Sequence, residues 1–186
     1  MENLNYIPEK DLENVPDYIE TDTLKIIIEQ SENSLCKIKC SDGGNGTGFF
    51  CIIPFPDKFH PLPVLMTNNH VIKENDIQKD KNIKFTLKND KLLFNIRIDE
   101  LRKVYTNEIY DITIIEIKGN DNLEMNSFLE IDDQIFKDNV NDIYRGKSIY
   151  LLSHPKGGKS SFSVGIIKNI EEKKNKKLYN KTFMQD

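Results

Sequence analysis

The sequence contains no tryptophan, only three cysteines, and no apolar run of the length that a membrane helix needs. A spanning helix requires roughly 20 consecutive apolar residues, so we expect no contact with a membrane. The acidic N-terminus also lacks the basic region and the apolar stretch of a secretory signal peptide. The sequence therefore predicts a cytoplasmic protein.

The cysteines, Cys36, Cys40 and Cys51, are odd in number, and no two of them form a Cys-x-x-Cys pair. Each lies inside an apolar segment, which indicates reduced, buried thiols rather than disulfides. A zinc site at Cys36 and Cys40 is the alternative, but no second pair and no nearby histidine completes it. We therefore expect no metal and no cofactor.

Neither sign of charge dominates the chain, because 26 basic and 30 acidic residues are spread along it and give a net charge of −4. The one basic cluster, residues 173–177, follows two glutamates and has no aromatic platform on which bases could stack, so we interpret it as a solvated turn. We expect no nucleic-acid partner. With 38% hydrophobic residues, the 186 residues suffice for one globular domain or one and a half.

Prolines and turn residues divide the chain into stretches. Residues 1–20 are polar and broken by two prolines, and apolar residues then recur at helical spacing from Asp22 or Thr23 to about Ser31. The predicted organisation is an extended arm over 1–20, a short helix over 21–34, a first β-barrel over 35–118, a connection over 119–147 and a partial second β-barrel over 148–186.

Closely spaced apolar segments with turns between them predict an all-β fold. Six candidate strands lie between residues 35 and 118, and the Pro-rich insert at 54–63 is interpreted as a loop between two of them. Two further strands are expected at Ser148–Ser153 and Ser161–Ile170. Such spacing favours an antiparallel barrel or sandwich over alternating β and α units.

Three features of the first barrel converge on one kind of chemistry. Gly46 and Gly48 open a strand, His70 follows another strand, and Asp111 leads into a strongly apolar run. A half-buried carboxylate must find a hydrogen-bond donor, and a histidine is a natural partner. An aspartate that accepts from His Nδ1–H leaves Nε2 free to take a proton from a nucleophile.

At these residues the sequence resembles the trypsin-like serine peptidases of the chymotrypsin fold, and most closely their disulfide-free intracellular or bacterial-type branch. The resemblance covers about residues 35–170. It rests on Gly46-Thr47-Gly48-Phe49, Thr67-Asn68-Asn69-His70-Val71, Asp111-Ile112-Thr113-Ile114-Ile115, His154-Pro155-Lys156-Gly157 and Ser163-Val164-Gly165-Ile166. The order of histidine before aspartate is that of the chymotrypsin-type triad.

The resemblance implies a double antiparallel β-barrel in which His70 is the catalytic base and Asp111 orients it. It also implies peptide or protein substrates, cleaved without metal or cofactor. The family carries its nucleophile in a Gly-x-Ser-Gly turn after the segment that matches Ser163–Ile166, and no Gly-x-Ser-Gly occurs here. Ser160 and Ser161 lie upstream of that segment. We therefore expect a peptidase truncated before its nucleophile and inactive by itself.

Alternatives remain open at this point. His70 could be a structural histidine at a strand end, and Asp111 a carboxylate that begins a strand. The whole chain could be a degenerate relative that binds a protein segment along an exposed sheet edge, or that has no function. Nothing in the sequence indicates an oligomeric state.

Two other histidines and one near-motif carry weaker signals. We expect His60 to be exposed in the Pro-rich loop and His154 to be a turn residue. The segment Ser153–Ser160 ends in Gly-Lys-Ser as a phosphate-binding loop does, but Ser153 replaces its first glycine and no helix is expected after it.

Overall fold

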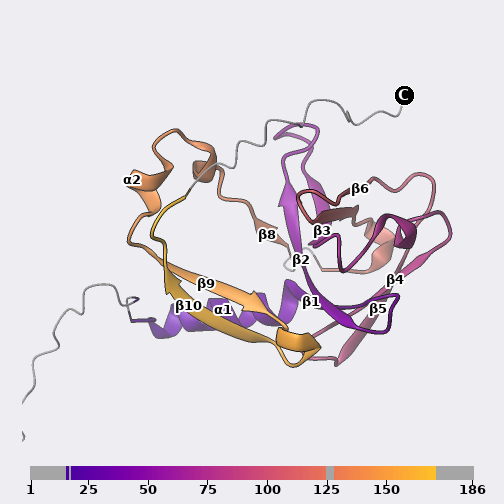
Figure 1. Ribbon diagram of the computed structural model, residues 1–186, viewed down its shortest axis with the longest axis horizontal. Helices are drawn as coiled ribbons and strands as arrows, with labels where there is room; N and C mark the ends of the chain where they lie inside the picture. The colour runs from indigo at the N-terminus through magenta and orange to yellow at the C-terminus, as the bar shows by residue number, and fades with distance from the viewer. Residues whose placement is uncertain (1–15, 17, 125–127, 171–186) are drawn as a thin grey trace, which may run out of the picture.

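The computed structural model describes residues 16, 18–124 and 128–170, and its architecture is mostly β, as the sequence predicts (Figure 1). No helix in this part of the chain is long and apolar enough to cross a membrane. The predicted arm over 1–20 and the end of the second barrel after 170 fall largely outside the described residues, as does the basic cluster at 173–177. The domain boundaries at 118 and 147 stay predictions.

The first sheet is built from antiparallel strands that follow one another closely along the chain. Its strands are β1 Leu35–Lys39, β2 Asn45–Ile53, β3 Leu62–Thr67, β4 Asn82–Leu87, β5 Leu92–Arg97, β6 Val104–Asn107 and β7 Ile112–Glu116. They lie in the order β5-β4-β1-β2-β3-β7-β6, and the two-residue strand β8, Leu129–Glu130, pairs with β2 in parallel. The result is a half-barrel.

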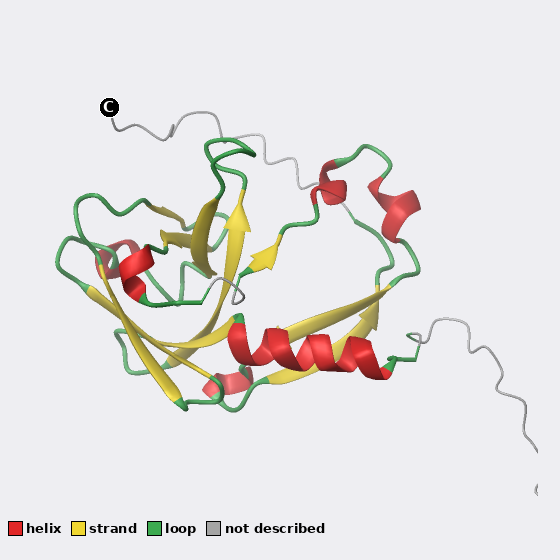
Figure 2. Ribbon diagram, turned by 180° about the vertical axis from the view of Figure 1, so that it is seen from behind, coloured by secondary structure: helices red, strands yellow, loops and turns green. Residues whose placement is uncertain are grey.

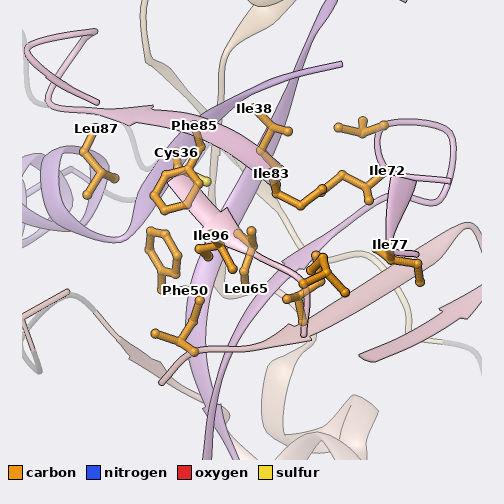
Figure 3. Close-up of a cluster of buried hydrophobic side chains, with 14 residues drawn as sticks. Cys36, Ile38, Phe50, Leu65, Ile72, Ile77, Ile83, Phe85, Leu87 and Ile96 are labelled. Atoms are coloured by element: carbon orange, nitrogen blue, oxygen red, sulfur yellow. The ribbon is translucent and has the colours of Figure 1, made fainter. Parts of the chain in front are cut away.

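The core fills the inner side of this half-barrel (Figure 3). Burial alternates along the strands, as β4 shows. Ile83, Phe85 and Leu87 of β4 are buried, while the residues between them are more exposed. Phe50 packs against Phe85, with ring centroids 5.4 Å apart. The remaining members of the cluster are Cys36, Ile38, Leu65, Val71, Ile72, Ile77, Ile96, Ile98, Ile115 and Ile117.

One buried arginine ties together strand ends near the two edges of the open sheet. Arg102 donates to the carbonyl of Arg97, at the end of β5, and to the carbonyl of Glu116, at the end of β7. Its guanidinium also forms two hydrogen bonds with Asp121, at 2.7 and 2.9 Å, and both side chains are almost fully buried. A buried guanidinium is stable only when such partners compensate its charge. Arg102 therefore holds β5 to the β6–β7 side of the sheet.

A helix and a second, smaller sheet lie beside the half-barrel. Helix α1, Thr21–Asn33, runs alongside the second sheet in both views (Figures 1 and 2). That sheet consists of β9, Ser148–Ser153, and β10, Ser161–Ile166, paired antiparallel over their full length. A short 3₁₀ turn, Pro155–Gly157, joins them.

The turn between β9 and β10 docks on the first sheet. The backbone N–H of His154 donates to Thr47 Oγ1 at 3.0 Å, and Ser160 donates to Asn89 through both its backbone N–H and its hydroxyl. Gly157 has a φ of +69° and lies so close to Asn45 that a Cβ there would come within 2.7 Å of the Asn45 Cβ. Only glycine satisfies both conditions.

Several details of the sequence-based prediction need correction. Strand β6 was not predicted, and neither were β8 and the short helix α2, Val140–Tyr144, within the 119–147 connection. Pro63 is not in a loop, because it lies inside β3 opposite Ile52. Helix α1 begins at Thr21, one or two residues before the expected start of the helical spacing at Asp22 or Thr23, and the preceding Glu20 gives no side-chain cap.

The cysteine prediction is correct in outline. All three thiols are free; Cys36 and Cys51 are buried, and Cys40 is half-buried. Burial raises the pKa of the Cys51 thiol to about 11 and that of the Cys36 thiol further. These two thiols therefore pack as buried apolar groups, and their raised pKa values make them poor nucleophiles.

Candidate active site

Strand pairing brings His70 and Asp111 together. Strand β3 ends at Thr67, and β7 begins at Ile112; the two pair antiparallel, with Thr67 opposite Thr113. The end of one strand therefore lies beside the start of the other. His70 comes three residues after β3 and Asp111 one residue before β7, so the two side chains meet at the same sheet end.

The contact between these residues is a double hydrogen bond. The backbone N–H of His70 donates to Asp111 Oδ1 at 2.9 Å, and His70 Nδ1 lies 2.7 Å from Asp111 Oδ2. The backbone N–H of His70, and next its imidazole, hold the pKa of the Asp111 carboxyl below its usual value. An ionised carboxylate only accepts, so Nδ1 carries a proton, and in the neutral form of the ring Nε2 is then the acceptor.

The backbone at Asp111 is adapted to this contact. Asp111 has a φ of +50°, a left-handed conformation that aspartate tolerates better than most residues. A turn from Glu108 supports it, in which the Asp111 N–H donates to the Glu108 carbonyl and the Tyr110 N–H donates to the Asn107 side chain. The turn aims the carboxylate back at the loop after β3.

The glycines of the Gly-x-Gly segment have a packing role beside this site. A Cβ at Gly46 would lie 2.3 Å from Val71 Cγ1, and one at Gly48 would lie 2.6 Å from Ile38 Cδ1. Gly46 therefore lets Val71, next to His70, lie directly on β2. Gly48 lets the core close beneath the same strand.

A histidine–aspartate contact alone is not distinctive in this chain. His60, exposed as predicted, also pairs with an aspartate, because its Nδ1 lies 3.0 Å from Asp57 Oδ1. That pair sits within one loop, three residues apart. Both pairs have the backbone N–H of the histidine as a second donor, but the His70–Asp111 pair joins segments 41 residues apart at the ends of two paired strands. The imidazole of His70 is 70% exposed and open to a reactant.

Two asparagines before His70 also belong to the site, and the sequence-based reasoning gave them no role. Asn68 Nδ2 donates to the Asp111 carbonyl at 3.1 Å and to Asp111 Oδ2 at 3.2 Å. Asn69 Nδ2 donates to Thr106 Oγ1 at 2.5 Å. Their position next to the histidine was the only signal in the sequence, since the acceptors lie 37 to 43 residues away.

The remaining candidates lie elsewhere. His154 is in a turn, as predicted, but it is buried; burial and the nearby Lys37 lower the pKa of its imidazole. A β-strand follows Ser160, so the Gly-Lys-Ser segment lacks the helix of a phosphate-binding loop. Across residues 18–124 and 128–170, no group of three or more His, Cys, Asp or Glu side chains could hold a metal ion.

No family model matches this chain, and no curated protein matches it in sequence. Among solved structures, it is similar to the crystal structure of the Rv3671c protease in its inactive form, at 18% identity and a TM-score of 0.50. The likeness covers 83% of this chain and 62% of that one, so the chain spans less than two thirds of its neighbour. The chain has a trypsin-like protease fold.

Proposed function

We propose that this chain is the base-bearing part of a serine endopeptidase, in which His70 is the general base and Asp111 orients it. The observation that carries the proposal is that two paired strands bring together His70 and Asp111, 41 residues apart, so that the His70 backbone N–H and Nδ1 contact the two oxygens of one carboxylate. This arrangement fixes the tautomer in which Nε2 can accept a proton. The fold adds support, because trypsin-like proteases use a histidine and an aspartate in this order.

The proposed reaction is acyl transfer from a peptide bond to water. Nε2 of His70 takes the proton of a serine hydroxyl as its oxygen attacks the peptide carbonyl, and the imidazolium then returns that proton to the leaving amine. Water repeats the sequence on the acyl-enzyme and releases the acid. Asp111 stabilises the imidazolium without taking its proton.

The nucleophile in this proposal comes from outside the 186 residues, because they contain no Gly-x-Ser-Gly turn. Among the described serines that follow His154, Ser160 forms a hydrogen bond through its hydroxyl. That hydroxyl donates to Asn89 and not to a histidine. The free thiols are in keeping with the disulfide-free branch and with a cytoplasmic location. Removal of the nucleophile from such an enzyme leaves at most residual catalysis, so these residues alone should be inactive.

The test uses the complete natural product of the gene that encodes these residues. Hydrolysis of a fluorogenic peptide library should be lost in His70→Ala and should fall by about 10⁴-fold in Asp111→Asn, which keeps the shape but reverses the hydrogen bond. His60→Ala is the matched control, because it removes the other exposed histidine of a histidine–aspartate pair. Equal activity in His70→Ala and His60→Ala would refute the proposal.

A second candidate function, the binding of a protein segment by the second sheet, is favoured by its exposed apolar surface. Ile149, Leu151, Phe162 and Val164 are between 38% and 65% exposed. Over the described residues this sheet has only two strands, and a two-stranded sheet is at most marginally stable alone. By the strand register, Ile149 and Leu151 lie on one face of this sheet and Phe162 and Val164 on the other, and an added strand would pair with an edge of the sheet beside them.

Hydrogen exchange separates this second candidate from the first. In a binding module, the 186-residue chain is folded and soluble by itself, and the amides of β9 and β10 gain protection when a partner is added. A chain that only aggregates, or whose partner leaves these amides unprotected, would contradict the binding function.

A further inference from the structure

A directional chain of hydrogen bonds runs behind His70. The Thr113 hydroxyl donates its only proton to the Ile72 carbonyl at 2.7 Å. Thr106 Oγ1 and Thr113 Oγ1 lie 2.9 Å apart, so Thr106 must be the donor in that pair. The Thr106 oxygen therefore accepts from Asn69, whose amide nitrogen lies 2.5 Å away.

This chain holds the His70 loop at two points. It starts at Asn69, immediately before His70, and ends at Ile72, two residues after it. Its middle members, Thr106 and Thr113, belong to the paired strands β6 and β7. Thr113 is fully buried, so an unsatisfied hydroxyl there would be costly. The loop that bears the histidine is thus tied to the hairpin that bears the aspartate.

Asn68 acts on the partner carboxylate directly. Its amide donates to Asp111 Oδ2, the oxygen that also accepts from His70 Nδ1, and to the Asp111 backbone carbonyl. One side chain thereby restrains both the backbone and the carboxylate of a residue with a left-handed φ. This donor also contributes to the lowered pKa of Asp111.

We propose that Asn68, Asn69 and Thr106 are positioning residues that hold His70 and Asp111 in their paired geometry using groups of the first sheet alone. The proposal rests on the proposed function for its catalytic meaning. The neighbouring asparagines have separate roles, since Asn68 fixes the carboxylate and Asn69, through Thr106, fixes the loop. The base and its orienting carboxylate are then preformed before any nucleophile arrives, which removes a reorganisation step.

The tautomer of the His70 imidazole is the direct readout. In the paired geometry Asp111 selects the Nδ1–H form. The ¹⁵N chemical shifts of the imidazole in the 186-residue chain distinguish this form from the Nε2–H form at neutral pH. Thr106→Val removes the hydroxyl with almost no change of shape, and Asn68→Ala removes the amide. Each should lower the ratio of the Nδ1–H to the Nε2–H form by about fivefold, the change that the loss of one hydrogen bond produces.

Two further variants separate positioning from stability. Thr106→Ser keeps the hydroxyl and should keep the wild-type tautomer ratio. Thr86 lies on β4, which is separated from β7 by three strands, and its hydroxyl donates to Asp90. Thr86→Val removes this hydrogen bond and should also leave the tautomer ratio unchanged. The proposal is overturned if Thr106→Val and Asn68→Ala keep the wild-type ratio, or if Thr86→Val changes it equally. Neither result bears on whether peptidase activity requires His70. The activity assay of His70→Ala therefore still tests the proposed function separately.

Discussion

Replacement of Gly46 by alanine probes the packing that supports the candidate site. The new Cβ would lie 2.3, 2.5 and 3.0 Å from Cγ1, Cγ2 and Cβ of Val71. Those atoms belong to a β-branched side chain that is 7% exposed and has little rotamer freedom. Val71 must therefore shift with its backbone, and such overpacking costs about 1–3 kcal/mol of unfolding free energy.

Urea unfolding followed by circular dichroism measures this cost. Gly119→Ala is the matched control, because its Cβ would meet no atom within 4 Å and Gly119 has no left-handed φ; its stability should stay within about 0.5 kcal/mol of wild type. Val71→Ala removes the two atoms nearest to the new Cβ. The Gly46→Ala/Val71→Ala double variant should therefore be more stable than the two single costs predict. If Gly46→Ala were as stable as Gly119→Ala, close packing of Val71 on β2 would be refuted.

Two further predictions concern buried charged or titratable groups. Arg102→Met should destabilise the fold by about 3–5 kcal/mol, because it leaves the buried Asp121 without its ion-pair partner. The double variant Arg102→Met/Asp121→Leu should recover much of that loss in chemical denaturation. A double variant that recovers none of the lost stability would contradict this. The pKa of His154 lies below its ordinary value of 6.5 through burial and Lys37, although Asp90 opposes them. Below pH 6.5 the unfolded chain then binds more protons than the native one, so stability should fall as the pH drops from about 7 to about 5. The loss should be smaller in His154→Phe, and parallel pH profiles of the two proteins would exclude this contribution.

Local patterns in the sequence were sufficient for most of the first sheet. The alternation in β4 and the turn residues around 41–46 place β1, β2 and β4 because burial on one face imposes a period of two. Strand β6 gave no such signal, since all four of its residues are half-buried. The short elements between 119 and 147 carry too few apolar residues for a pattern.

The candidate site was predictable only in part, for a related reason. His70 and Asp111 stand in recognisable segments, and the antiparallel pairing of β3 and β7 brings those segments together. Asn68 and Asn69 act on groups about 40 residues away, and Thr106 lies in the strand that was missed. The burial of His154 likewise depends on a turn that docks against the first sheet at Thr47. Contacts of this kind follow from the tertiary arrangement, not from local spacing.

The role of His70 as the base of a serine peptidase can be tested by the intact mass of the complete gene product after treatment with a fluorophosphonate, which labels only an activated serine. We predict a mass increase of one probe per chain in the wild type and in His60→Ala, and none in His70→Ala. A wild-type protein that takes up no probe, or a His70→Ala variant that is labelled as fast as wild type, would contradict that role.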